Sequence, residues 1–460
     1  MREQISTSVW QEQLPSFETD REDINHAWDM AVRDLLSNVC LYQDGLLKEK
    51  APVMLAGSRY DTPWTRDASI NTWNAGALLI PDVAKNTMLS VLTQEDGACR
   101  VGGQYWDAII WVVGAYHYYL CTGDEDFFPL MVSASENSLA YFEETEFDPE
   151  KGLFRGPACY GDGVAAYPDR YVTGESGIRA FPRYFQEKCA SKGEGIPCFT
   201  LSTNCLYAES YRLAYVMTGK EEYLQKHNAL KTRINEVFWN EEKGRYDYLV
   251  DPWGREVVQE ALGESFAILF GIADETQKKR IVENCVRTPN GIPCIDVRYE
   301  RYTPYGIGRH CGTVWPFAQA FLADAAAAIR PELFSEELEV STKNALRAGQ
   351  FAEIFHPETG EPYGGVQEAG GPISDDWHSV PHQTWSATGY LRMLLKDLAG
   401  LHFEEKGIRI TPVRIPGVSR LSLKGLHYRD AVLDISIGPD GWEKNSWVPA
   451  DSKGSLQIRQ

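Results

Sequence analysis

Several features that define large classes of proteins are missing from this sequence of 460 residues. Its ten cysteines form no Cys-x-x-Cys pair and no Cys/His cluster, which argues against a zinc site and favours small buried residues in a reducing compartment. No run approaches the ~18 apolar residues of a membrane helix. The N-terminal residues also lack the apolar core of a secretory signal. We therefore expect a cytoplasmic protein with no membrane partner, no metal and no cofactor.

Positive charge is also scarce. The chain has 45 Lys and Arg against 65 Asp and Glu, and its formal net charge is −20. An anionic surface repels phosphate backbones, so nucleic acid is not expected as a partner. Aromatic residues, in contrast, are abundant at 12%, with 13 Trp and 23 Tyr. That content is compatible with aromatic-rich helix packing and with exposed rings that bind carbohydrate.

Helical periodicity dominates the first 400 residues. Pro81, Gly123, Gly219 and Pro331 separate neighbouring segments by one or two residues, which is typical of antiparallel helical hairpins. The predicted helices are 23–42, 67–80, 82–94, 104–122, 125–145, 200–218, 220–239, 257–271, 274–288, 313–329, 333–351 and 383–399.

Long loops at 43–66, 146–199, 289–312 and 352–382 alternate with these tight turns. Loops longer than ~12–15 residues inside a compact domain are usually functional. If six hairpins close into a ring, the long loops meet at one end of it. The sequence therefore predicts an all-α fold, an (α/α)6 barrel of about twelve helices with its site at the long-loop end.

After about residue 400 the pattern changes to alternating apolar and polar residues, in 407–416, 419–430 and 431–441. We expect two domains, a barrel at 1–400 and a small C-terminal β-strand appendage at 401–460.

A weak repeat follows three predicted helices, with the sequences FDPEKGLF at 147–154, FWNEEKGRY at 238–246 and FHPETGEPY at 355–363. Each has an aromatic residue, a polar turn, a glycine and a second aromatic residue. True repetition and a common helix-exit turn with a left-handed glycine explain the pattern equally well.

The stretch Phe351–Leu395 combines a carboxylate with aromatic residues. Glu353 is expected at the C-terminal edge of a helix, and Trp385 lies at the start of the next helix after a turn-rich loop that contains Trp377. An aromatic face suits the C–H surface of a pyranose, and a carboxylate can do acid–base work on a glycosidic bond. Glu368, in the same loop, is the main rival of Glu353.

A second candidate segment is Tyr60–Asp67, which precedes the second predicted helix. Arg66 and Asp67, next to Trp64, can donate to and accept from vicinal sugar hydroxyls. The alternative is a helix-capping Asp in a salt bridge with the Arg.

These segments resemble motifs of known glycosidases. Trp64-Thr65-Arg66-Asp67 resembles the W-T-R-D motif of glucoamylases, glycoside hydrolase family 15, in which the Arg and Asp bind the terminal sugar. Glu353 followed by Thr384-Trp385-Ser386-Ala387 is similar to a pattern shared with glycoside hydrolase family 63. The segment Gly308–Pro316, which includes His310 and Trp315, is similar to another family 63 segment. Thr313 departs from that segment, where the family usually has Pro, and this leaves the exact family and the sugar open.

The resemblance implies an inverting, exo-acting glycoside hydrolase, α-glucosidase-like, in which Glu353 is the general base. In these families the general acid lies in the loop that corresponds to 146–199, and Asp162 is its best candidate here. Tyr160 and Tyr167 would desolvate Asp162 and raise its pKa. The alternative is a simple Gly-Asp-Gly turn, and Asp169 and Glu175 are reserve candidates for the acid.

The expected partner is a carbohydrate substrate. The predicted substrate-binding residues are Tyr60, Trp64, Arg66, Asp67, Gln104, Trp106, Asp107, Tyr160, His310, Trp315, Trp377 and Trp385. Two kinds of alternative stay open. One is another enzyme on the same barrel: an α-L-rhamnosidase-type hydrolase, a glycoside phosphorylase or a sugar epimerase. The other is a glycan-binding protein without catalytic activity.

Overall fold

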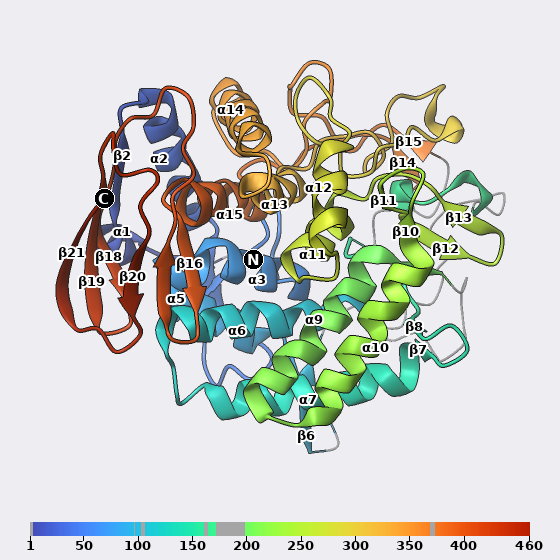
Figure 1. Ribbon diagram of the computed structural model, residues 1–460, viewed down its shortest axis with the longest axis horizontal. Coiled ribbons are helices and arrows are strands. Elements are labelled where there is room, and N and C mark those ends of the chain that lie inside the picture. Colours follow the sequence, from blue (N-terminus) through green and yellow to red (C-terminus); the bar gives the residue numbers. More distant parts are fainter. Residues whose placement is uncertain (1–2, 96, 103–105, 161–163, 172–197, 369–372) are drawn as a thin grey trace.

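Helices arranged in two layers are the main secondary structure of the molecule (Figure 1). The computed structural model describes residues 3–460 except 96, 103–105, 161–163, 172–197 and 369–372. In the inner layer each helix packs against the next, and the last packs against the first, so the contacts close a cycle. The inner segments are α3 (Thr65–Asn71) with η1 (Thr72–Gly76) and α4 (Ala77–Leu79), η2 (Trp106–Ile109) with α6 (Ile110–Thr122), α9 (Leu201–Thr218), α11 (Ala261–Leu269), α13 (Pro316–Ala327), and α15 (Thr384–Arg392) with η7 (Met393–Leu398).

The sequences of the two layers explain which helices are inside. Every residue of α13, with the sequence PFAQAFLADAAA, is buried, as expected for a helix that is apolar on all sides. The outer helices carry one apolar face and one charged face, so α10 buries only a stripe that includes Leu230 and Ile234. The outer helices are α2 (Glu22–Ser37), α5 (Pro81–Ser90), α7 (Phe128–Glu146), α10 (Glu221–Phe238), α12 (Glu275–Glu283) and α14 (Pro331–Ala348).

All twelve predicted helices are present in the described part of the chain, but several end earlier than predicted. The predicted helix 23–42 ends at Ser37, because Val39–Tyr42 pairs with Ala51–Met54 as strand β3. The predicted helix 333–351 ends at Ala348, because Gly349 adopts a left-handed φ of 67°. Glu353 therefore lies in the loop after α14 and not at the edge of the helix.

The repeated sequence forms the same hairpin three times. Phe147 pairs with Phe154 and Trp239 with Tyr246, each directly after an outer helix, and Phe355 pairs with Pro362 in the loop that follows α14. The glycine has a φ of 65° at Gly152, 63° at Gly244 and 70° at Gly360. In each hairpin the glycine N–H donates to the carbonyl four residues earlier. The repeat is thus a recurring hairpin that requires a left-handed glycine.

Small sheets occupy the connections between helices. The hairpins at the right of Figure 1 come from the connections that lead into the inner helices. Outside the C-terminal region, the described short elements are α1 (Ser8–Gln13), β1 (Glu3–Gln4), β2 (Ser16–Thr19), β3, β4 (Ala51–Met54), β5 (Leu92–Glu95), β6 (Ala98–Val101), β7 (Phe147–Asp148), β8 (Leu153–Phe154), η3 (Val164–Ala166), η4 (Asp169–Tyr171), β9 (Phe199–Thr200), β10 (Trp239–Asn240), β11 (Arg245–Tyr246), β12 (Leu249–Asp251), β13 (Gly254–Glu256), η6 (Glu300–Tyr302), β14 (Gln367–Glu368) and β15 (Ile373–Ser374).

The C-terminal segment forms strands, at the left of Figure 1. One sheet has the order β16-β17-β20, and the other has the order β2-β18-β19-β21, so it includes a strand from near the N-terminus. Strand β16 packs against α6 and η7. The strands therefore lie at the end of the inner ring where these two segments finish. They are β16 (Leu401–Glu404), β17 (Gly407–Ile410), β18 (Leu421–Tyr428), β19 (Ala431–Ile437), β20 (Ser446–Pro449) and β21 (Gly454–Arg459).

Candidate active site

The N-terminal ends of three inner helices bring the candidate residues together. Trp64 precedes α3, Trp315 precedes α13, and Gln383 precedes α15, each in an extended backbone conformation. Pro316 at the first position of α13 suits a helix start, because its missing N–H would have no partner there. These helix N-termini lie next to the long loops, so side chains from helices and loops meet at one end of the cycle of inner helices.

Glu353 is a buried carboxylate at this end, with 2% of its surface exposed. Its backbone N–H donates to the Val380 carbonyl at 3.0 Å. Its Oε1 accepts from the Tyr60 hydroxyl at 3.2 Å, and its Oε2 accepts from the Val380 N–H at 3.2 Å and from the Arg309 guanidinium. Hydrogen bonds of this kind hold a carboxylate in a single orientation and balance its charge.

Arg309 connects Glu353 to the surrounding loops and rings. Its Nη1 donates to the Gly364 carbonyl at 2.7 Å. Its guanidinium carbon lies 5.4 Å from the ring centroids of both Trp315 and Trp377. A side chain at Gly365 would place its Cβ 2.4 Å from the Arg309 Cα, so glycine is required where the loop crosses this arginine.

Next to Arg309, aromatic side chains contact one another in succession. His310 lies between Trp315, at 4.3 Å between centroids, and Tyr160, at 5.7 Å. Trp315 meets Trp385 edge-on at 5.8 Å, and the Arg66 guanidinium carbon lies 5.9 Å from the Trp385 ring. Apolar faces with a few fixed polar groups are the usual lining of a small-molecule site.

Burial changes the protonation of this lining. It lowers the pKa of His310 well below its usual value, with help from the charges of Arg309 and Arg66. The imidazole is therefore neutral and offers one donor and one acceptor. Burial also raises the pKa of Tyr160 well above its usual value, and the carboxyl of Glu260 adds to the effect.

Some buried polar atoms at this end have no hydrogen-bond partner among the described residues. They are the Nε1 of Trp64, the Nε1 of Trp385 and the Nδ1 of His310. Buried donors without a partner are costly, and in native structures most are satisfied by protein groups or ordered water. A ligand rich in hydroxyl groups would supply acceptors for the two indole N–H groups and either a donor or an acceptor for the imidazole nitrogen.

The structure therefore groups many of the predicted residues. Tyr60, Arg66, Tyr160, His310, Trp315, Glu353, Trp377 and Trp385 are linked by the contacts above, and Trp64 and Asp67 flank Arg66. Asp162, Gln104 and Glu175 lie outside the described residues. Trp106 and Asp107 lie in η2, and only their backbone is described.

Two rival carboxylates have a different setting. Glu368 is buried, and it accepts from the Arg301 Nε at 3.0 Å and from the Tyr302 hydroxyl. Asp169 accepts from Arg301 Nη1 at 2.6 Å and from the Glu300 N–H at 3.0 Å. Arg301 thus holds both carboxylates, and it also donates to the Val164 and Tyr167 carbonyls.

Arg309 and Arg301 were absent from the predicted site. Arg309 lies next to His310 in the sequence, but its partner Glu353 is 44 residues further on. Two signals in the sequence could have pointed to it, namely its position directly before His310 and its place inside the segment Gly308–Pro316 that resembles family 63. Among the described residues, no group of three or more His, Cys, Asp or Glu side chains has the arrangement of a metal site.

Two helical layers, with a buried carboxylate among aromatic rings at one end, are consistent with an (α/α)6-type glycosidase fold. The chain belongs to the family described as the mannosylglycerate hydrolase MGH1-like glycoside hydrolase domain, whose model matches residues 55–386. The predicted resemblance to glycoside hydrolases of this type is confirmed by this match. No curated protein matches the sequence.

Solved structures with the same fold include enzymes of several families. One is a GH63 mannosylglycerate hydrolase from Thermus thermophilus in complex with Tris, with a TM-score of 0.55, 13% identity, and coverage of 80% of this chain and 100% of that chain. A GH78 family rhamnosidase of Bacillus sp. GL1 has a TM-score of 0.57 at 16% identity, with 97% of this chain and 44% of that chain covered.

A sialidase has a TM-score of 0.70 at 15% identity, and the match covers 98% of this chain and 41% of that chain. The chain thus spans less than half the length of the sialidase and of the Bacillus rhamnosidase. Of the helices that the structure describes, none combines the length and the apolar character that a membrane span requires.

Proposed function

We propose that this protein is an inverting, exo-acting glycoside hydrolase, α-glucosidase-like, that removes a terminal sugar. The glycoside hydrolase domain at residues 55–386 supports the reaction class. We also propose that the two helical layers form an (α/α)6 barrel within residues 1–400 and that 401–460 is an appendage to it. The observation that carries the proposal is the buried Glu353 carboxylate, held by Arg309 and Tyr60 among aromatic rings.

Glu353 is proposed as the general base. In an inverting reaction the base takes a proton from a water that attacks the anomeric carbon from the face opposite the leaving group. The ion pair with Arg309 and the hydrogen bond from Tyr60 hold the Glu353 carboxylate in one orientation. Arg66 and Asp67, near Trp385, are proposed to bind hydroxyls of the terminal sugar.

Asp162 is proposed as the general acid. The proposal for Asp162 comes from the resemblance in the sequence, and the residue itself lies outside the described part of the chain. Tyr160 and Tyr167, on either side of it in the sequence, are buried. Asp169 is less suited to this role, because its two carboxyl oxygens already accept hydrogen bonds from Arg301 and from the Glu300 N–H. Inversion requires a gap of ~6.5–9.5 Å between the two carboxyls.

A mannosyl glycoside of a small acid is the second candidate substrate, because the matching family model is described by mannosylglycerate hydrolase. An α-L-rhamnosidase-type reaction is the remaining hydrolytic alternative from the sequence. Purified protein should therefore be assayed with aryl α-glucosides, mannosylglycerate and aryl α-L-rhamnosides. Phosphate-dependent release of the sugar would instead identify a phosphorylase.

The variant Glu353→Gln tests the proposed base. Loss of a general base lowers kcat by about 10²–10⁴-fold, whereas substrate binding is largely kept because the side chain is isosteric. The matched control is Glu368→Gln, which also removes a buried carboxylate paired with an arginine. We expect Glu368→Gln to lower the melting temperature but to keep most of the activity of the folded protein. Unchanged turnover in Glu353→Gln would remove this residue from the mechanism.

A further inference from the structure

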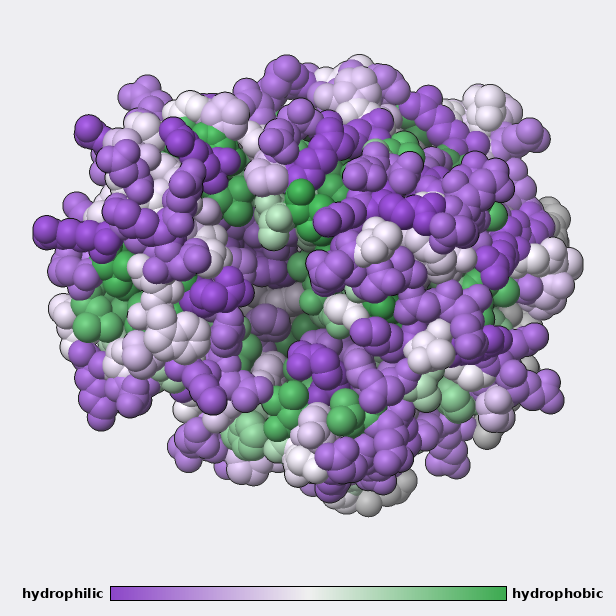
Figure 2. All heavy atoms as spheres, in the orientation of Figure 1, coloured by the Kyte–Doolittle hydropathy of each residue, from purple (hydrophilic) through white to green (hydrophobic). Residues whose placement is uncertain are grey.

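The structure contains a cavity at the end of the inner ring opposite the candidate active site. Figure 2 shows a hollow near the centre of this face, between β16, α6 and α11, and the cavity there has a volume of about 490 Å³. Its lining residues come from the C-terminal parts of inner helices and from the C-terminal strands. They include Trp73, His117, Arg212, Phe270, Arg392 and Trp447.

This cavity is separate from the candidate active site. Trp73 lies seven residues after Arg66 in the same helical segment, and Arg392 lies seven residues after Trp385, which corresponds to about 10 Å along each axis. Between the two ends, Trp73 packs against Phe321 at 4.8 Å and against Phe266 at 6.1 Å between centroids. These aromatic side chains lie inside the cycle of inner helices, between the cavity and the candidate active site.

Three of the cations around the cavity, Arg212, Arg392 and Lys396, are paired within the protein. Arg212 donates to Glu209 through two nitrogens, at 2.8 and 2.6 Å. Arg392 and Lys396 both bind Asp324, at 2.7 and 2.6 Å. A free anion or cation would compete with these pairs, so the cavity favours a neutral ligand that uses the remaining donors and acceptors.

Apolar faces accompany these polar groups. His117 stacks on Trp73 at 5.1 Å, and burial together with the nearby Arg392 lowers the pKa of His117 well below its usual value. The neutral ring adds one donor and one acceptor. At the mouth, Phe403 of β16 and Trp447 of β20 add aromatic surface, and Trp447 is 45% exposed.

The backbone next to the cavity is also unusual. Trp73 lies in the π-helical segment η1, and Lys396 lies in the π-helical segment η7. π-Helical turns are rare and occur frequently at functional sites. Two such segments, from helices far apart in the sequence, border the same cavity.

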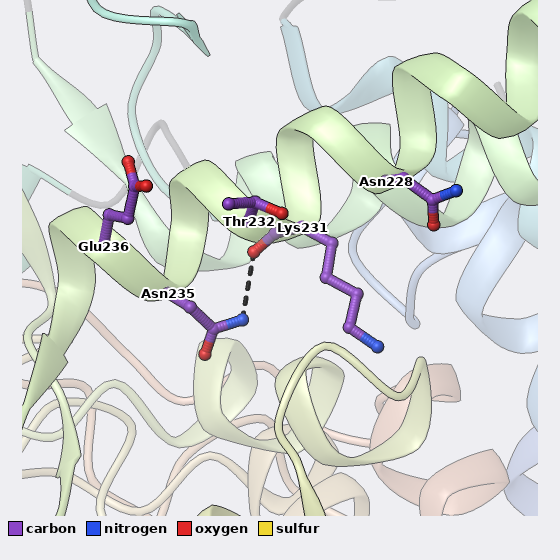
Figure 3. A pocket seen from close by; sticks show the side chains of 5 residues that line it. All are labelled: Asn228, Lys231, Thr232, Asn235 and Glu236. Atoms are coloured by element: carbon purple, nitrogen blue, oxygen red, sulfur yellow. Dashed lines mark hydrogen bonds between the residues drawn. The ribbon is translucent and has the colours of Figure 1, made fainter.

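A second hollow, along α10, lacks the features of a binding site. A groove of about 690 Å³ runs along α10 and is lined by Asn228, Lys231, Thr232, Asn235 and Glu236 (Figure 3). All five side chains come from one helix, and Asn235 already donates to the carbonyls of Lys231 and Ile272. No groups converge on a ligand there.

We propose that the cavity bounded by Trp73, His117, Arg392 and Trp447 is a second binding site, for a neutral polyhydroxylated ligand of the size of a mono- or disaccharide. Aromatic faces contact the C–H surfaces of such a ligand, and the paired Arg and Glu side chains exchange hydrogen bonds with its hydroxyls. The ligand would bind there without being converted, and this proposal does not depend on the role assigned to Glu353.

Fluorine NMR of protein labelled with 5-fluorotryptophan tests this proposal, because it reports the two ends of the ring separately. The 13 tryptophans are assigned by single Trp→Phe variants. The probes are glucose, mannose, rhamnose, trehalose and inorganic phosphate, each at about 10 mM, tenfold above the Kd of about 1 mM that we expect for a small sugar. We expect at least one sugar to shift the Trp73 and Trp447 signals and phosphate to leave both unchanged.

Two variants make the result specific. Trp447→Ala should weaken sugar binding by about tenfold through loss of aromatic contact, so that the Trp73 shift at about 10 mM sugar falls to roughly half of its size in the parent protein. Trp253→Ala, the control, removes another exposed tryptophan, 59% exposed, and should leave the shift unchanged. The proposal is overturned if no sugar shifts Trp73, if phosphate alone does so, or if Trp447→Ala binds as well as the parent protein. Signals of Trp315 and Trp385 report the candidate active site, so failure there leaves this test intact.

Discussion

The two ends of the same six inner helices differ in how their polar groups are satisfied. At the C-terminal end, Asp324 binds both Arg392 and Lys396 within the protein. At the N-terminal end, Glu353 also has an arginine partner, but buried donors such as the Trp64 and Trp385 indole N–H groups have none among the described residues. Disrupting a group that the protein pairs itself costs folding free energy, whereas a buried donor without a protein partner favours a ligand that supplies an acceptor.

The comparison also separates two uses of buried charge. A buried ion pair contributes little net stability, yet removing one partner is costly because the other charge stays buried. At the C-terminal end that cost falls on folding. At the N-terminal end the ion pair of Glu353 fixes a group that we propose to react with substrate. Substitutions at the two ends should therefore affect different measurements.

Asp324→Asn, at the C-terminal end, should have the largest effect on the free energy of unfolding. The variant leaves the charges of Arg392 and Lys396 without their shared carboxylate, and we expect a loss of about 3–5 kcal/mol in the free energy of unfolding. Urea denaturation measures this loss. The molecules that remain folded should keep their kcat.

The control for Asp324→Asn is Glu358→Gln, which removes an exposed ion pair with Arg298. Exposed pairs contribute about 0–1 kcal/mol, so this variant should unfold nearly as the parent does. If both variants lost the same stability, or if Asp324→Asn lost catalysis without loss of stability, the assignment of the C-terminal ion pairs to folding would be wrong.

Glu264 is a buried carboxyl that lies between the two ends. Replacing it should have a smaller effect on stability, and one that depends on pH. Burial raises the pKa of Glu264 to about 8, and neither carboxyl oxygen has a hydrogen-bond partner among the described residues. The folded protein holds this proton up to about pH 8, whereas the unfolded chain releases it near pH 4.5. Stability therefore falls as the pH rises through this window.

Glu264→Gln removes this pH-dependent cost. We expect the variant and the parent to have similar free energies of unfolding at low pH, and the variant to be more stable by up to about 4 kcal/mol at pH 8. The difference between the two proteins isolates this residue, since other titrating groups are common to both. A difference that stays constant with pH would contradict the raised pKa.

The sequence predicted the helices well because their signals are local. Proline and glycine mark the turns, and apolar periodicity marks the faces that pack inward. Helix ends were less predictable where the competing structure is non-local. Val39–Tyr42 is apolar enough to continue a helix, and only its partner strand, Ala51–Met54, makes it a strand.

The candidate site was predictable to the extent that its motifs are contiguous. Arg66 and Asp67 are adjacent, and Glu353 is followed by a recognisable helix start at Trp385. The contact between Arg309 and Glu353 joins residues that are 44 positions apart, and no periodic pattern in the sequence predicts it. The cavity at the opposite end was also not predictable, because its wall combines helices with strands that follow more than 130 residues after Phe270.

The anomer formed first by the enzyme tests the central claim most directly. With an accepted α-glycoside, proton NMR during the first minutes of hydrolysis distinguishes the α from the β product before mutarotation mixes them. A base at Glu353 that activates water on the opposite face predicts the inverted, β anomer. Formation of the α anomer would mean a retaining reaction and would contradict the proposed mechanism.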